Sequence, residues 1–132
     1  MRKEKPSRTA LKVALSTVTL GSKPGMEAIL PAGIVDATRK LLVASGAAGE
    51  RTVKWSKSQT SVAIYEAFDW MLLGQFEAFA HRKAFCERQV RDGINDGATQ
   101  ILVLGAGYDK LGWRLATEFS GVNFFEIDHP AI

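Results

Sequence analysis

Residues 100–130, QILVLGAGYDKLGWRLATEFSGVNFFEIDHP, restrict the choice of fold more than any other part of the chain. Residues 101–104 form a continuous apolar run, which is typical of a parallel strand covered by helices on both faces. A glycine-rich turn follows, and the residues from Asp109 onward favour a helix. Residues 122–127 form a second apolar run that ends in acidic residues. This order predicts a parallel α/β unit with a ligand site at the carboxyl ends of its strands.

Two acidic residues, Glu126 and Asp128, end this unit. Side chains alternate along a strand, so both carboxylates are expected on the same side. A carboxylate placed here can accept hydrogen bonds from the two hydroxyls of a cofactor ribose, and its separation from Gly105 is close to the roughly 20 residues expected for such an acid. Asp128 lies nearer the open end and is the better candidate. Glu126 could contact the cofactor as well or orient the loop.

The glycine turn favours one class of cofactor over another. Gly105 and Gly107 lack a Cβ, so the backbone can turn tightly and a ligand can approach closely. A dinucleotide-binding turn has a third glycine three residues after Gly107, but this chain has Lys110 there. Asp109 would repel a phosphate at the start of the helix, whereas it would suit a zwitterionic cofactor such as S-adenosylmethionine, or simply cap the helix. The turn therefore favours S-adenosylmethionine over a nicotinamide dinucleotide.

The motifs resemble those of the leucine carboxyl methyltransferase family of S-adenosylmethionine-dependent methyltransferases, including its bacterial branch of polyketide O-methyltransferases. The resemblance rests on LGAGYD at 104–109, WRL at 113–115 and FFEIDHP at 124–130. Upstream, RTALKVA at 8–14 and HRKAFCERQV at 81–90 look like the amino-terminal helices of the family. The pairing of GAGYD with EIDHP at this distance is more specific than either motif alone.

The resemblance implies a Rossmann-like class I methyltransferase fold that uses S-adenosylmethionine to methylate a carboxylate or hydroxyl of a small molecule or protein. It also implies that Gly105 contacts the cofactor through its backbone and that Asp128 binds the ribose. Arg82 falls where the family has an arginine that reaches the cofactor's carboxylate, although by composition alone it could be an ordinary surface arginine. A nicotinamide-dependent Rossmann oxidoreductase remains the alternative enzyme.

Only two strands are evident in the 132 residues, which is too few for a complete doubly wound sheet. We therefore expect a helical cap region over residues 1–97 and the start of an S-adenosylmethionine-binding domain over residues 98–132, as the incomplete first part of the fold. A two-stranded parallel sheet leaves at least one strand edge unpaired and much of its surface uncovered. Through that edge the chain could pair with a carboxyl-terminal half on another chain or with itself. It could also be a truncated, non-catalytic remnant or a partner subunit.

Four helical regions are expected before the first strand, over residues 9–20, 26–45, 59–73 and 75–93. The second is expected to be interrupted near Pro31 and Gly33. Residues 49–58 are polar and predict a loop. The third helix is apolar on all sides and is expected against the sheet or beneath the cofactor. The fourth carries Cys86 on an apolar stripe, as a buried and inert thiol, with Arg82 at the edge of that stripe. In the helix after the glycine turn, Arg114 is expected to be exposed.

The composition restricts the partners and the location of the protein. The net charge is +3, and much of the excess lies in a basic amino-terminal tail rather than on one face. Without interleaved aromatic residues this tail predicts no nucleic-acid binding, and no apolar run approaches the roughly 20 residues of a membrane span. A single cysteine is compatible with a cytoplasmic location, and two histidines are too few to indicate a metal site.

Overall fold

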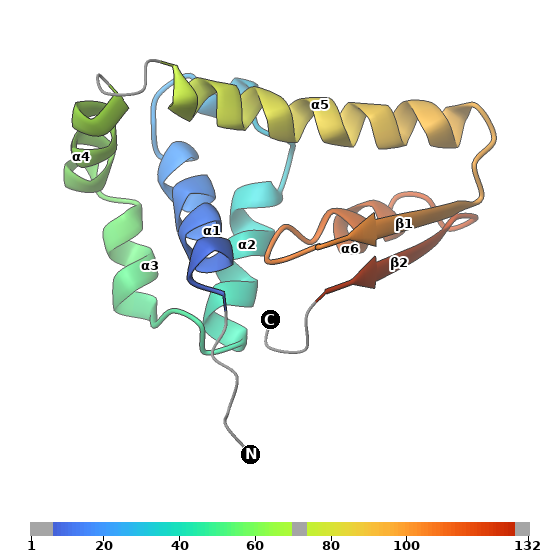
Figure 1. The fold of residues 1–132 in the computed structure, drawn as a ribbon, viewed down its shortest axis with the longest axis horizontal. Helices are drawn as coiled ribbons and strands as arrows, with labels where there is room; N and C mark the ends of the chain where they lie inside the picture. The colour runs from blue at the N-terminus through green and yellow to red at the C-terminus, as the bar shows by residue number, and fades with distance from the viewer. Residues whose placement is uncertain (1–6, 70–73, 129–132) are drawn as a thin grey trace.

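A computed structural model of the chain describes residues 7–69 and 74–128 and shows a mixed α/β arrangement (Figure 1). The helical region comprises α1 (Arg8–Leu20), the 3₁₀ helix η1 (Met26–Ala28), α2 (Ile34–Ala44), α3 (Glu50–Ser56), α4 (Gln59–Asp69) and α5 (Gln75–Asn95). The glycine unit comprises β1 (Gln100–Leu104), α6 (Leu111–Ala116) and β2 (Asn123–Ile127). In Figure 1 the long α5 extends from the helical region at one end to the strands at the other, so it spans both parts of the molecule.

The helices agree with the sequence prediction at most positions. The helical region over 26–45 is interrupted where the sequence predicts it, because it forms η1 and α2 with Pro31 and Gly33 between them. The loop predicted for residues 49–58 is wrong, because residues 50–56 form α3. Val53 gives the physical reason: its side chain is 3% exposed and packs in the core, so tertiary burial outweighs the polar local composition.

The position of α4 against the sheet, one of the two expected, is also wrong. It packs against α1, α3 and α5 rather than against the sheet, and Figure 1 shows it at the opposite end of the molecule from the strands. The last part of the helix predicted there, residues 70–73, lies outside the described residues. Among the described side chains of α4, only Ser61 and Val62 are buried, and Ile64 is 41% exposed, so the apolar composition of this segment does not place it against the sheet.

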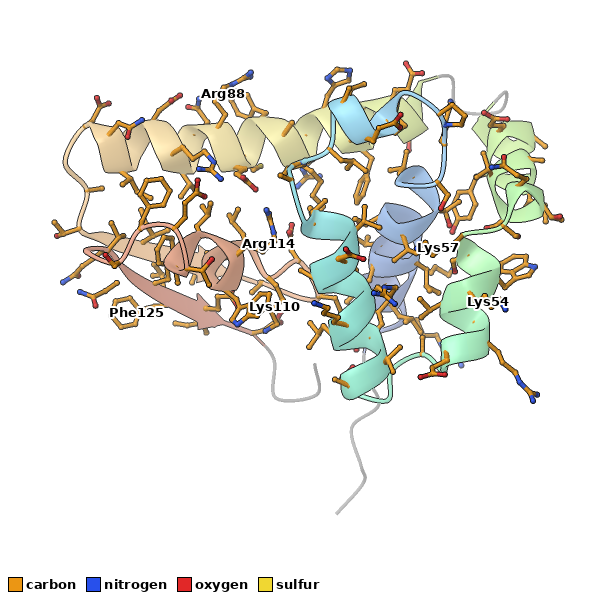
Figure 2. All side chains as sticks on the ribbon, turned by 180° about the vertical axis from the view of Figure 1, so that it is seen from behind. Lys54, Lys57, Arg88, Lys110, Arg114 and Phe125 are labelled. Atoms are coloured by element: carbon orange, nitrogen blue, oxygen red, sulfur yellow. The ribbon has the colours of Figure 1, made fainter. Side chains whose placement is uncertain are left out.

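Within the described residues, β1 and β2 form a two-stranded parallel sheet with a register that runs from Gln100↔Asn123 to Leu104↔Ile127. Helix α6 packs against both strands. The described residues cover only one face of the sheet. The apolar run of β1 is typical of a strand covered on both faces, but a sheet of only two strands is also expected to leave much of its surface uncovered. The large apolar side chains on the other face are 52–72% exposed: Leu102, Leu104, Phe125 and Ile127. Figure 2 shows Phe125 on the side of the sheet that faces away from α5.

The core consists of two clusters within the helical region. One contains Ala14, Val18, Leu42, Ala48, Val53 and Tyr108, and the other contains Leu20, Met26, Leu30, Ile34 and Ala80. Tyr108 belongs to the glycine turn, yet its side chain is only 5% exposed and packs among the helices. Its carbonyl oxygen accepts a hydrogen bond from Thr38 Oγ1 on α2, with an O···O distance of 3.5 Å. The helical core thereby holds the glycine turn in place.

A buried ion pair forms a second connection between the two parts. Arg114 on α6 was expected to be exposed, but its side chain is 8% exposed and donates to Glu87 on α5 at 2.6 Å. It also donates to the carbonyl of Ala32 at 3.1 Å, and Figure 2 shows the side chain directed towards α5. Arg114 points to the helical region because α5 lies across this side of α6, an arrangement that local periodicity does not encode. No helix in the described part of the chain is long and apolar enough to cross a membrane.

Candidate functional site

A cavity of about 470 Å³ lies where the glycine turn meets α1 and α5. The turn contributes residues 105–109, and α5 contributes Arg82, Lys83 and Cys86. Helix α1 closes another side with Ala10, Ala14 and Thr17, among others. The cavity is therefore at the carboxyl end of β1, where open α/β sheets bind ligands. Its volume is in the range of small-molecule sites.

The glycine turn has a geometry that requires its glycines. Gly105 and Gly107 have φ angles of 66° and 56°, in the left-handed region that other residues rarely adopt. The N–H of Gly105 donates to the carbonyl of Ile127 at 2.8 Å, which ties the start of the turn to the end of β2. A Cβ at Gly105 would meet no atom within 4 Å, so the space beside this residue is open to a ligand.

Asp128 and Glu126 both accept hydrogen bonds from the backbone of the segment that follows β1, but at different places. Asp128 accepts from the N–H of Gly107 and thus touches the edge of the cavity. Glu126 accepts from the N–H of Gly112 at 2.9 Å and lies 3.5 Å from Lys110 Nζ. Neither carboxylate lines the cavity. Asp128 is positioned beside the site, whereas Glu126 holds the amino-terminal end of α6, so its assignment to the cofactor stays a prediction.

Arg82 lines the cavity, as its sequence position suggested. Its side chain is exposed and forms no hydrogen bond or ion pair with any residue in 7–69 or 74–128. A guanidinium at a cavity without a protein partner is suited to a ligand carboxylate. Cys86, one turn further along α5, lines the same cavity and is exposed, so the expectation of a buried thiol is wrong.

Asp109 does not cap α6. The residue before that helix is Lys110, which has a φ of 49°, and no side chain caps the helix from that position. Asp109 Oδ2 instead forms an ion pair with Lys83 inside the cavity wall, where the two side chains are 26% and 15% exposed. The second carboxylate oxygen, Oδ1, is buried without a hydrogen-bond partner among the described residues. Lys83 Nζ also lies 5.4 Å from the ring centre of Phe79.

The structure thus brings Arg82, Gly105 and Gly107 together and places Asp128 beside them. Sequence reasoning missed Lys83, Tyr108 and the contribution of α1. Lys83 adjoins Arg82 and could have been noticed, but its partner is 26 positions away. No local pattern links the two residues, because only the packing of α5 beside the glycine turn brings them into contact. The described residues contain no cluster of three or more histidine, cysteine or acidic side chains that could hold a metal ion.

The sequence model of one protein family, leucine carboxyl methyltransferase, matches residues 28–132. The chain belongs to the leucine carboxyl methyltransferase family. This confirms the resemblance drawn from the motifs, since the match includes both the glycine turn and the acidic end of β2.

Two related proteins match parts of this chain. Leucine carboxyl methyltransferase 1 of Caenorhabditis elegans is 30% identical over 82 residues, which cover 60% of this chain and 23% of that protein. YktD of Bacillus subtilis (strain 168), whose name assigns it to the S-adenosyl-L-methionine-dependent methyltransferases, is 36% identical over 50 residues, or 38% of this chain and 16% of that protein. The chain therefore matches less than a quarter of either relative. No solved structure is significantly similar to it.

Proposed function

We propose that this protein binds S-adenosylmethionine and methylates an oxygen atom, either a carboxylate or a hydroxyl of a small molecule or protein. The observation that carries the proposal is the cavity of about 470 Å³, which is lined by Gly105, Gly107 and Arg82, a side chain that forms no ion pair with the described residues. Membership of the leucine carboxyl methyltransferase family supports it. Nothing in the site favours the nicotinamide-dependent alternative, because Lys110 occupies the place of the third glycine.

The residues around the cavity fit the charges of this cofactor. Arg82 supplies a guanidinium for the carboxylate at the amino-acid end of the cofactor. Oδ1 of Asp109 is buried and accepts no hydrogen bond from the described residues, so it could accept one from the amino group of the cofactor. Gly105 lets the cofactor approach the backbone closely. Asp128 accepts a hydrogen bond from the N–H of Gly107, which places its carboxylate at the edge of the cavity, where a cofactor ribose could reach it.

The proposed methyl transfer requires little acid or base catalysis by the protein. Bound S-adenosylmethionine would supply a methyl group that is already activated by its sulfonium. A carboxylate acceptor is ionised at neutral pH and needs no general base. The protein then acts mainly by aligning the acceptor with the methyl group and by excluding water. We assign no catalytic residue, and the site residues proposed are Arg82, Gly105, Gly107 and Asp128, with Glu126 as the support of α6.

The proposed domain organisation follows from the uncovered sheet. We propose that residues 98–132 begin a Rossmann-like S-adenosylmethionine-binding domain and that residues 1–97 form a helical cap over it. Parallel sheets occur almost only with both faces covered, whereas Leu102 and Phe125 are 57% and 52% exposed on one face. We propose that further βα units of the methyltransferase domain pack on this face. Self-association of the chain is the competing outcome.

Calorimetric titration tests the cofactor assignment. Saturable binding of S-adenosylmethionine is expected, with no binding of NAD at the same concentrations. Arg82→Ala should weaken binding at least about tenfold, because a charge-assisted pair with the cofactor carboxylate is lost. Arg88→Ala is the matched control, since Arg88 is also exposed on α5 but does not line the cavity. Preferential binding of NAD, or equal effects of the two substitutions, would contradict the proposal.

A further inference from the structure

Helices α2 and α3 form a second hollow, of about 610 Å³, which shares no lining residue with the glycine-turn cavity. Its basic side chains are Arg39, Lys40, Lys54 and Lys57, and its one acidic side chain is Glu50. We call this hollow the α2–α3 groove. Figure 2 shows Lys54 and Lys57 at α3, the helix that lies beside α2.

The basic residues converge because of their spacing on two short helices. Glu50, Val53, Lys54 and Lys57 are separated by three, one and three positions, so they share one face of α3 and its carboxyl-terminal end. On α2, the basic residues at 39 and 40 stand one turn before Val43, which is 36% exposed. Packing of α2 on α3 therefore brings the two basic faces to one hollow, with apolar side chains between them.

The positive charge of the groove is poorly balanced by the protein. Among the described residues, Lys40, Lys54 and Lys57 form no ion pair or hydrogen bond through their side chains. Arg39 lies 3.4 Å from Asp36 through Nη2, but its Nε is buried and has no hydrogen-bond partner. Like charges that converge on one hollow repel one another. A bound anion would neutralise this repulsion.

We propose that the α2–α3 groove binds a small, multiply charged anion that carries phosphate groups. The volume lies within the range of small-molecule sites. A phosphate monoester carries between one and two negative charges at neutral pH and three acceptor oxygens, which matches several lysines and an arginine around one hollow. An extended nucleic acid is less well suited, because no aromatic side chain lines the groove to stack with a base. This site is independent of the methyltransferase proposal.

The test is calorimetric titration of the protein with pyrophosphate at about 150 mM salt, where the general attraction of exposed charges is largely screened. We expect saturable binding with one site per chain. The double substitution Lys54→Gln/Lys57→Gln should weaken it by about tenfold or more, because two charge-assisted contacts are removed. The matched control is Arg8→Gln/Lys12→Gln, which removes the same charge from exposed positions on α1 that do not line the groove.

Circular dichroism is used to check that both double variants keep their helices. Equal weakening in the two variants, or binding that does not saturate, would mean only non-specific attraction and would overturn the proposal. Titrations with a short DNA duplex and with anionic lipid vesicles show whether the groove binds either of them more tightly than it binds pyrophosphate. If either binds more tightly than pyrophosphate through Lys54 and Lys57, the groove recognises a macromolecule or a membrane surface, and the small-anion assignment is wrong. Arg39→Lys gives an independent check, since it keeps the charge but removes the planar guanidinium, which can bind a phosphate through two parallel hydrogen bonds, and should still weaken pyrophosphate binding.

Discussion

Arg114 on α6 donates a hydrogen bond to Glu87 on α5 at 2.6 Å, and the two side chains are only 8% and 7% exposed. Arg91 donates to the same carboxylate at 2.9 Å and to Glu118 at 2.7 Å, so the charges form a connected network between α5 and the glycine unit. The network fixes α6 relative to the helix that carries Arg82. The geometry of the proposed cofactor site therefore depends on residues that do not line it.

Loss of Arg114 should destabilise the protein. In Arg114→Met the Glu87 carboxylate stays buried with Arg91 as its remaining partner, and breaking a buried pair on one side costs about 3–5 kcal/mol. We expect the free energy of unfolding in urea to fall by about 3 kcal/mol, at the low end because Arg91 remains. Arg88→Met, at an exposed position of the same helix, should change it by less than about 0.5 kcal/mol. The double variant Arg114→Met/Glu87→Leu should recover much of the loss, and no recovery would argue against an uncompensated carboxylate as the cause.

Glu118 should contribute to the free energy of unfolding at neutral pH but not at acidic pH. The hydrogen bond from Arg91 lowers the pKa of Glu118 below its usual value of 4.5, and the charges of Arg91 and Arg114 act in the same direction. A carboxylate whose pKa is lower in the folded state stabilises the fold above its unfolded pKa and loses this contribution as the pH falls through the folded value. The same contacts raise the pKa of Arg91, which has no effect below strongly alkaline pH.

Glu118→Gln should therefore make the stability of the protein less sensitive to pH below about 4.5, while stability at neutral pH changes little because Glu118 is exposed. The measurement is urea unfolding at a series of pH values from neutral to acidic. Glu27→Gln is the control, since Glu27 is exposed and forms no ion pair among the described residues. An identical pH profile for the wild type and Glu118→Gln would contradict the prediction.

Tyr108 should couple the helical core to the glycine turn. Its side chain is 5% exposed within the first core cluster, and truncation of a buried aromatic residue to alanine costs about 3–5 kcal/mol. Tyr108→Ala should lower stability by that amount and should also weaken S-adenosylmethionine binding, because the backbone between Gly107 and Asp109 loses its anchor. Thermal unfolding and calorimetry report the two effects. Trp113→Ala, at a residue that is 57% exposed, should leave both nearly unchanged.

A charged substitution on the sheet face formed by Leu102, Leu104, Phe125 and Ile127 should leave the stability of the protein unchanged only if this face is exposed to solvent. If further βα units cover it, as proposed, Leu102→Asp places an unpaired carboxylate in an apolar contact and should cost about 2 kcal/mol or more. Trp55→Asp, at an exposed residue of α3, should cost less than about 1 kcal/mol. Urea unfolding gives both values, and sedimentation velocity shows whether the face is instead covered by a second copy. A neutral effect of Leu102→Asp on both measurements would contradict a covered face.

The unit of strand, turn, helix and parallel strand could be predicted from the sequence, because the apolar runs, Gly105 and Gly107 act locally on the backbone. The family could be predicted as well, since GAGYD and EIDHP are short motifs whose spacing can be read directly. Arg82 could be placed at the cavity from its position in the motif that precedes the turn. Most helices were predictable for the same local reasons, apart from α3, where burial of Val53 overrides a polar composition.

Only the tertiary structure decided which charges meet. Lys83 pairs with Asp109 and Glu87 pairs with Arg114, although the partners are 26 and 27 positions apart in the sequence. They meet because α5 packs across the glycine unit. The basic faces of α2 and α3 are visible as patterns, but their convergence on one hollow is a property of helix packing. Exposure of Cys86 and burial of Arg114 reversed the predictions for the same reason. Periodicity along one helix shows which residues share a face, whereas the neighbour that covers this face is set by the rest of the chain.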